Sequence, residues 1–184
     1  MSEALLVIDV QESFRHTAYW HEEELANYLV AQNRLINGAR AAGIPVVRVF
    51  HVQEDGGPFS KDFNYIVPLI GSDGYADHTV EKHVHSALVD TDLVQWLKER
   101  DIDRLIISGI RTEQCCETTT RNASDIGFKV DYVTEATLTF PMRHANGRIY
   151  TPHEIRERTE LVLAGRFARI CTVDAVLSRL PVLI

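Results

Sequence analysis

The chain has 184 residues, of which 45% are hydrophobic and 24% charged, and its formal net charge is −7. This composition is typical of a globular protein, and the length fits one domain over residues 1–184. Negative charge without a cluster of Lys or Arg argues against nucleic-acid binding. No apolar run is long enough to span a membrane, and no basic segment precedes the first apolar run, so neither a membrane span nor a signal peptide is predicted. Three cysteines make a poor disulfide framework, which favours a cytoplasmic protein.

The amino-terminal half alternates between strand-like and helix-like segments. Residues 4–9 form an apolar run that ends in an acid, which predicts a strand buried on both faces. Residues 22–42 have apolar side chains at helical spacing, and residues 45–50 are typical of a second strand. The segment 53–77 is rich in Gly, Asp, Ser and Pro and is too long for a simple connection, which is typical of a functional loop.

The carboxyl-terminal half continues this alternation. We expect helices over residues 91–100, 115–126 and 152–165, and strands over residues 104–108, 129–134 and 168–173, with a second loop around 141–151. Strands interleaved with helices favour an α/β protein with a three-layer αβα, Rossmann-like fold. Its sheet is expected to be mainly parallel, with about six strands.

Three residues that could carry chemistry follow predicted strands. Asp9 ends the first strand, His51 follows the second, and Cys115 lies shortly after the strand that ends near Ser108. Ligands of a parallel sheet bind beyond the carboxyl ends of its strands, so we expect these side chains to open onto one edge. Cys115 is also expected to begin a helix, where unpaired N–H groups and the helix dipole lower the pKa of a thiol.

These residues also have ordinary structural explanations. Asp9 could cap a turn or a helix, Lys82 could be a solvated surface lysine, and a lone cysteine such as Cys115 is more often inert than catalytic. A helix turns about 100° per residue, so Cys116 points away from the partners of Cys115 and is expected in packing. Cys171 is expected in the core.

Four blocks of the sequence, in order, resemble the isochorismatase-like cysteine hydrolases. The blocks are Leu6-Val-Ile-Asp9-Val-Gln11, residues 80–88 with 91–93, the Gly-Ile-x-Thr-x-x-Cys segment from Gly109 to Cys115, and residues 118–127. The resemblance runs from residue 4 to about residue 176. Any one block is weak, but the ordered set of acid, lysine and cysteine is specific.

The resemblance implies a catalytic triad of Asp9, Lys82 and Cys115, without a cofactor. Cys115 would attack the carbonyl carbon and form a thioester, Asp9 would act as general base and acid, and Lys82 would stabilise charge. The resemblance also implies an oxyanion hole from the backbone N–H groups of Arg111 and Cys115, and a cis peptide bond between Ile110 and Arg111. It further implies a homodimer or homotetramer.

The segment after the second predicted strand bears on metal binding. Nicotinamidases of this kind carry an Asp-x-His metal site there, whereas this chain has Phe50-His51-Val52-Gln53. His78, His83 and His85 could join His51 around a metal, but scattered loop histidines are more often solvated, so no metal is expected. True isochorismatases lack the nucleophilic cysteine, so the resemblance favours amidase-type hydrolysis here.

Side chains from loops at the same edge are candidates to bind a small-molecule substrate. The candidates are Gln11, Phe14, Trp20, His51, Arg111 and Phe140, with Tyr19, Phe59 and Phe63 as further aromatic residues that could instead pack loops or a subunit interface. Arg111 could hold a carboxylate or a carbonyl group. It favours a small planar amide, ureide or carbamoyl compound, anionic ones included.

Two other classes of protein stay open. The adjacent Cys115 and Cys116 could serve a thiol redox protein, which would not need Lys82. A non-catalytic family member could keep the fold and assemble through its long loops, although the intact triad argues against this.

Overall fold

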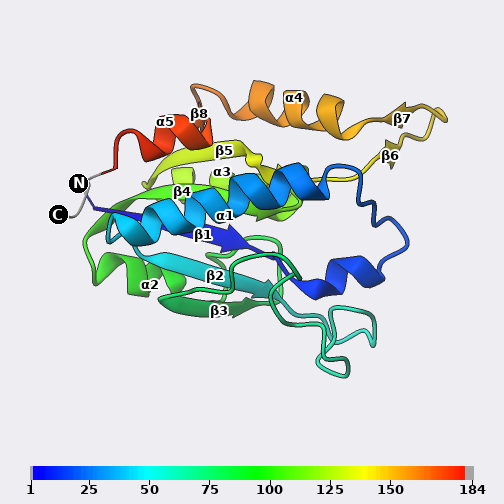
Figure 1. Cartoon of the computed structure of the whole chain (residues 1–184), viewed down its shortest axis with the longest axis horizontal. Helices are drawn as coiled ribbons and strands as arrows, with labels where there is room; N and C mark the ends of the chain where they lie inside the picture. Colours follow the sequence, from blue (N-terminus) through cyan, green and yellow to red (C-terminus); the bar gives the residue numbers. More distant parts are fainter. Residues whose placement is uncertain (1, 181–184) are drawn as a thin grey trace.

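The computed structural model describes residues 2–180, and its centre is a six-stranded sheet in which all neighbouring strands are parallel. The spatial order is β3-β2-β1-β4-β5-β8, so the direction in which strands are added reverses between β1 and β4 (Figure 1). The expected α/β fold with a parallel sheet of about six strands is confirmed. The strands are β1 (Ser2–Ile8), β2 (Val46–His51), β3 (His78–Lys82), β4 (Ile102–Ile110), β5 (Lys129–Leu138) and β8 (Arg169–Cys171).

Helices cover both faces of the sheet. Helices α1 and α5 pack on one face, and α2, α3 and the end of α4 pack on the other. Successive side chains of a strand point to opposite faces, so Leu5 and Val7 of β1 enter one core while Leu6 and Ile8 enter the other. One uninterrupted apolar run therefore joins three layers. The helices are α1 (Leu25–Ala41), α2 (Leu93–Lys98), α3 (Glu117–Asp125), α4 (Pro152–Leu163) and α5 (Val173–Leu177).

Several elements differ from the sequence prediction because pairing with neighbours decides them. β4 and β5 continue to Ile110 and Leu138, beyond their predicted ends, because the two strands pair with each other up to that point. β3 is absent from the prediction. Only Val80 and Lys82 of its residues are buried, as suits an edge strand, and the strand contains a single large apolar residue, so the sequence shows no apolar run.

The two long loops differ in structure. Residues 53–77 hold neither a helix nor a strand, apart from an isolated bridge between Gln11 and Pro68. The expected loop at 141–151 instead contains an antiparallel hairpin, β6 (Met142–Arg143) and β7 (Ile149–Tyr150), which extends with α4 beyond the sheet (Figure 1). A 3-10 helix, η1 (Glu12–His16), follows β1.

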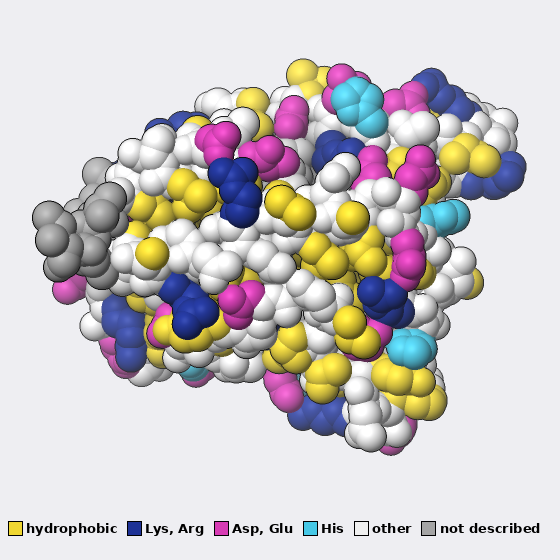
Figure 2. Space-filling view, in the orientation of Figure 1, with side chains coloured by type: hydrophobic (Ala, Val, Ile, Leu, Met, Phe, Trp, Pro, Cys, Tyr) yellow, Lys and Arg dark blue, Asp and Glu magenta, His cyan; other side chains and the backbone are white. Residues whose placement is uncertain are grey.

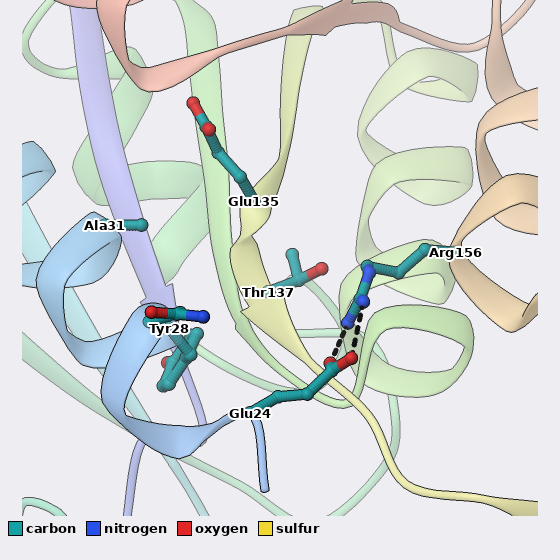
Figure 3. A pocket seen from close by; sticks show the side chains of 7 residues that line it. Glu24, Tyr28, Ala31, Glu135, Thr137 and Arg156 are labelled. Atoms are coloured by element: carbon teal, nitrogen blue, oxygen red, sulfur yellow. Dashed lines mark hydrogen bonds and ion pairs between the residues drawn. The ribbon is translucent and has the colours of Figure 1, made fainter. Parts of the chain in front are cut away.

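The face that α1 covers carries interspersed acidic and basic side chains (Figure 2). Glu24, at the start of α1, accepts two hydrogen bonds from Arg156 of α4. This pair borders a cavity of about 280 Å³ that α1, β5 and α4 line, with Tyr28 and Thr137 among its walls (Figure 3). Within residues 2–180, no helix is long and apolar enough to cross a membrane. The single domain and the homo-oligomeric state stay predictions.

The Glu24–Arg156 pair should stabilise the fold in a pH-dependent way. Hydrogen bonding to Arg156 lowers the pKa of Glu24 below its usual 4.5. Because the pair is partly exposed, Arg156→Gln should lower the free energy of unfolding by at most about 1 kcal/mol near neutral pH. A carboxyl group whose pKa is lower in the folded than in the unfolded state stabilises the folded protein at pH values above its unfolded-state pKa. This stabilisation is lost as the pH falls through the folded-state pKa. Urea unfolding between about pH 7 and pH 3 should show the difference shrinking; a constant difference would contradict this account.

Gly109 should be required for β1 and β4 to pair. Its φ is +130°, and a Cβ built on it would lie 2.0 Å from the carbonyl oxygen of Ile8. A side chain would therefore push the strands apart next to Asp9, so Gly109→Ala should lower the free energy of unfolding by about 3 kcal/mol or more. Gly127→Ala is the matched control, since Gly127 also has a positive φ but has nothing within 4 Å of its Cβ position. Equal losses in the two variants, measured by urea unfolding, would refute the steric explanation.

Candidate active site

The carboxyl ends of four neighbouring strands bring the predicted triad together. Asp9 directly follows β1, Lys82 ends β3, and Cys115 follows β4 by one short turn. His51 ends β2, and side-chain atoms of Asp9, His51 and Cys115 all lie within 4.8 Å of one another. The expected common edge is therefore present, and it includes the point between β1 and β4 where strand order reverses.

The turn after β1 presents the carboxylate of Asp9. Its backbone adopts a left-handed conformation with φ of +53°, which aspartate tolerates better than most residues. Its N–H donates to the carbonyl oxygen of Val49, and its own carbonyl oxygen accepts from the N–H of Gln11, both at 2.9 Å. The side chain is fully buried.

The Lys82 ammonium lies among four acceptors. Nζ is 2.9 Å from Asp9 Oδ2 and 2.9 Å from His51 Nδ1, and it donates to Cys115 Sγ at 3.4 Å and to the carbonyl oxygen of Val84 at 3.1 Å. Lys82 has no exposed surface, so the surface-lysine explanation is wrong. Its burial follows from its inward-facing position on β3.

Burial governs the titration of the triad. It raises the pKa of Asp9 above its usual 3.8, although the Lys82 charge acts in the opposite direction. Burial also raises the pKa of the Cys115 thiol, and Asp9 raises it further, while Lys82 acts to lower it. The expectation of a lowered pKa for this thiol is therefore wrong, because desolvation and Asp9 together outweigh the lowering by Lys82. The resting thiol is protonated at neutral pH.

The neighbouring basic groups have opposite charge states. Burial alone would lower the pKa of Lys82, but Asp9 and Cys115 together raise it, so the ammonium stays charged. Burial and the Lys82 charge lower the pKa of His51 to about 4. His51 is thus neutral and accepts a hydrogen bond from Lys82 through Nδ1.

A short turn joins β4 to the cysteine. The Ile110–Arg111 peptide bond is cis, as expected. A π-helical turn, Thr112–Cys116, then precedes α3, so the helix expected from Cys115 starts with a wider turn. The hydroxyl of Tyr132 donates to the carbonyl oxygen of Thr112 at 2.7 Å and fixes this turn.

The two other cysteines lie outside the triad. Cys116 is fully buried in the core, as expected. Cys171 is only partly buried, because it lies on the edge strand β8 and packs against the margin of the other core.

An aromatic cluster borders the site. Its members are Phe14, Tyr19, Trp20, Phe59 and Phe140, whose rings contact one another across three loops. The cluster reaches His51, which lies beside the triad, through Phe59, whose ring centre is 5.7 Å from that of His51. Phe140 is completely buried, whereas Tyr19 is 37% exposed and so connects the cluster to solvent.

Gln11 has a positioning role instead of a free amide. Its Nε2 donates to Ser13 Oγ at 2.9 Å and to the carbonyl oxygen of His51 at 3.0 Å, and its Oε1 accepts from the N–H of His51 at 2.8 Å. Both amide hydrogens are therefore used within the protein. Gln11 fixes the end of β2 next to Asp9 and leaves no free donor for a substrate.

Arg111 turns its side chain toward the aromatic cluster, where it meets an acid. Its guanidinium carbon is 4.8 Å from the centre of the Tyr19 ring and 5.7 Å from that of Phe140. Nη2 lies 3.0 Å from Glu113 Oε1, and Glu113 Oε2 accepts from Thr139 Oγ1 at 2.6 Å. The sequence prediction missed Glu113. The sequence feature that could have indicated it is an acidic residue two positions after Arg111, in the same turn.

The isochorismatase domain family matches residues 3–149 of the chain. The chain belongs to the isochorismatase family. It is 31% identical to nicotinamidase 3 of Arabidopsis thaliana over 93% of this chain and 85% of that protein. It is 32% identical to streptothricin hydrolase of Streptomyces noursei over 95% of this chain and 60% of that protein. A solved isochorismatase-type structure from Burkholderia xenovorans LB400 has a TM-score of 0.88 and 32% identity, covering 97% of this chain and 86% of the other.

The histidines of this isochorismatase-family chain do not gather as a set. His78 begins β3, at the opposite end from Lys82, and stacks on Trp96. The ring of His85 is 6.3 Å from that of His51, and His85 is exposed. Asp9, His51 and Cys115 could hold a metal ion by their spacing. The Lys82 ammonium already lies within 3.4 Å of an atom of each, so a second cation there would meet strong repulsion.

Lys82→Met should slow alkylation of Cys115 and move its pH dependence to higher pH. Lys82 lowers the pKa of both Asp9 and Cys115, so its loss leaves less carboxylate to accept the proton and less thiolate at a given pH. A thiol pKa that is higher by one leaves about tenfold less thiolate near neutral pH and slows labelling about tenfold. Iodoacetamide labelling followed by peptide mass spectrometry measures the rate, with Cys171 as internal reference. An unchanged pH profile for Cys115 would argue against electrostatic control by Lys82.

Proposed function

We propose that this protein is a cysteine hydrolase that cleaves the carbon–nitrogen bond of a small amide, ureide or carbamoyl compound. One observation carries this proposal: the buried Lys82 ammonium lies 2.9 Å from the Asp9 carboxylate and 3.4 Å from the Cys115 sulfur. The arrangement supplies a nucleophile, a base and a fixed positive charge. Relatives named nicotinamidase and streptothricin hydrolase support amide hydrolysis.

In the first half of the reaction, Cys115 transfers its thiol proton to Asp9 and attacks the carbonyl carbon. The electron pair of the C=O bond moves to oxygen, which accepts hydrogen bonds from the backbone N–H groups of Arg111 and Cys115. As the C=O bond re-forms, the C–N bond breaks and the leaving nitrogen takes the proton from Asp9. Ammonia or an amine departs, and a thioester remains on Cys115.

In the second half, water replaces the nitrogen. Asp9, ionised again, takes a proton from water while the oxygen attacks the thioester carbon. The C–S bond then breaks, and the sulfur recovers its proton from Asp9. A carboxyl group with a raised pKa suits this alternation, because it accepts and returns a proton nearer to neutral pH. Lys82 keeps its charge throughout and offsets the buried negative charge.

The alternative of a thiol redox protein has less support. Burial, followed by the influence of Cys115, raises the pKa of Cys116 well above its usual value, so Cys116 is a poor attacking thiolate. Cys116 is also fully buried. The Lys82–Asp9 pair would have no task in such chemistry, and a non-catalytic family member would gain nothing from burying it.

Ammonia release from a panel of small amides, ureides and carbamoyl amino acids tests the proposed hydrolysis. Cys115→Ala should reduce release by about a thousandfold or more, because no thioester can form. Cys171→Ala is the matched control and should retain the wild-type rate, since Cys171 lies on edge strand β8. Ammonia release that persists in Cys115→Ala would refute the mechanism. It would also be refuted if wild type released ammonia from none of the compounds.

A further inference from the structure

We propose that Glu113 determines the specificity of this site by cancelling the charge of Arg111. The site then accepts uncharged amides and discriminates against amides that also carry a carboxylate. This inference rests on the proposed function and narrows its substrate class. It reverses the simplest expectation for an arginine in a substrate site, which is selection of anions.

The two buried ion pairs of this edge of the sheet, one beside Cys115 and one on the turn that carries it, add no net charge. Lys82 is paired with Asp9 at 2.9 Å, and Arg111 is paired with Glu113 at 3.0 Å. The side chains of Lys82 and Asp9 are completely buried, and those of Arg111 and Glu113 are only 10% and 9% exposed. A carboxylate entering this site would be an uncompensated buried charge, which is costly, whereas a neutral amide adds none.

Glu113 already neutralises the charge of Arg111. Glu113 holds one end of its guanidinium, and the rings of Tyr19 and Phe140 lie within 5.7 Å of its central carbon. Glu113 is held in turn by the hydroxyl of Thr139 at 2.6 Å. An anionic ligand at the guanidinium would therefore lie beside a carboxylate that is already fixed in place.

One atom of this pair is left to hydrogen-bond a ligand. Arg111 Nε is buried and has no hydrogen-bond partner within the described residues 2–180, whereas Glu113 Oε1 lies 3.0 Å from Arg111 Nη2 in the ion pair. The Nε–H group can donate to the carbonyl oxygen of a neutral amide or ureide. A carboxylate at the same place would lie beside the Glu113 carboxylate and be repelled by it.

The pair belongs to the same site as the proposed nucleophile. The carbonyl oxygen of Arg111 accepts from the N–H of Cys116 at 3.3 Å, within the turn that carries Cys115. The Arg111 guanidinium lies over the ring of Tyr19, whose pKa is raised by burial. Discrimination at Arg111 and Glu113 therefore acts on molecules that approach Cys115.

Iodoacetamide and iodoacetate form a matched pair of probes for this inference. Each alkylates a thiolate with loss of iodide, and they differ only in an amide against a carboxylate. The measured quantity is the rate ratio of iodoacetamide to iodoacetate at Cys115, divided by the same ratio for N-acetylcysteine amide. In wild type we expect a normalised ratio of about ten or more, since a tenfold preference needs only about 1.4 kcal/mol of differential interaction.

Two variants separate charge from packing. Glu113→Gln keeps the side-chain shape but leaves Arg111 unpaired, so the normalised ratio should fall by about tenfold. The double variant Arg111→Met with Glu113→Gln is neutral again, so its ratio should return toward that of wild type. Circular dichroism checks that each variant is folded; if Glu113→Gln does not fold, the single variant Arg111→Met, which leaves the Glu113 carboxylate unpaired, should raise the ratio instead.

Three results would overturn the inference. They are a wild-type ratio equal to that of the reference thiol, an unchanged ratio in Glu113→Gln, and a double variant that behaves like the single one. Because alkylation needs no amide turnover, these results are independent of whether the protein releases ammonia. The neutral succinamide and the anionic succinamate then test the same selectivity in turnover, where the effect should fall on kcat/KM.

Discussion

The ion pair between Lys82 and Asp9 is the interaction on which the rest of the site depends. Both side chains lack any exposed surface, and a buried charge without its partner is strongly destabilising. The pair therefore requires β1 and β3 to keep their places on either side of β2. The register of the sheet meets this requirement, because Lys82 pairs with His51 across β2 and β3, and Ile8 pairs with Val49 across β1 and β2.

Burial also explains why the proposed nucleophile has low reactivity in the absence of a substrate. An exposed thiolate beside a lysine would react with many electrophiles, but here desolvation and the neighbouring Asp9 raise the pKa of Cys115 and keep its proton in place. In the proposed mechanism, activation then depends on Asp9 taking that proton once a substrate occupies the site. The Arg111–Glu113 pair adds no net charge to the turn that carries the thiol.

Much of the fold and the position of the site follow from the sequence, because apolar runs of a parallel sheet show where strands end. Asp9 and Cys115 are located in this way. The burial of Lys82 could not be derived from the local pattern, since Thr79 and Glu81 alternate with the inward-facing residues of an edge strand. Only the family resemblance pointed to Lys82.

Two further features of the site were not predicted correctly from the sequence, and both depend on residues that are distant along the chain. The pKa of Cys115 was expected in the wrong direction because desolvation depends on residues far away in the chain, whereas the start of a helix is visible locally. The partnership of Arg111 with Glu113 depends on the shape of the π-helical turn and on Thr139 at the end of β5. Neither is encoded in a spacing rule.

The earlier and later parts of the loop of residues 53–77 make different contacts, and the buried Arg48 contacts the later part. Its guanidinium donates to the carbonyl oxygen of Asp73, and nearby backbone hydrogen bonds attach Tyr65, Val67 and Leu69 to the segment after β1. The later part of the loop is thus fastened to the sheet. Cys115 is only 7% exposed, and Phe59, which packs against His51, belongs to the earlier part. The same loop is therefore tied to the sheet through its later part and places an aromatic ring beside the catalytic edge through its earlier part.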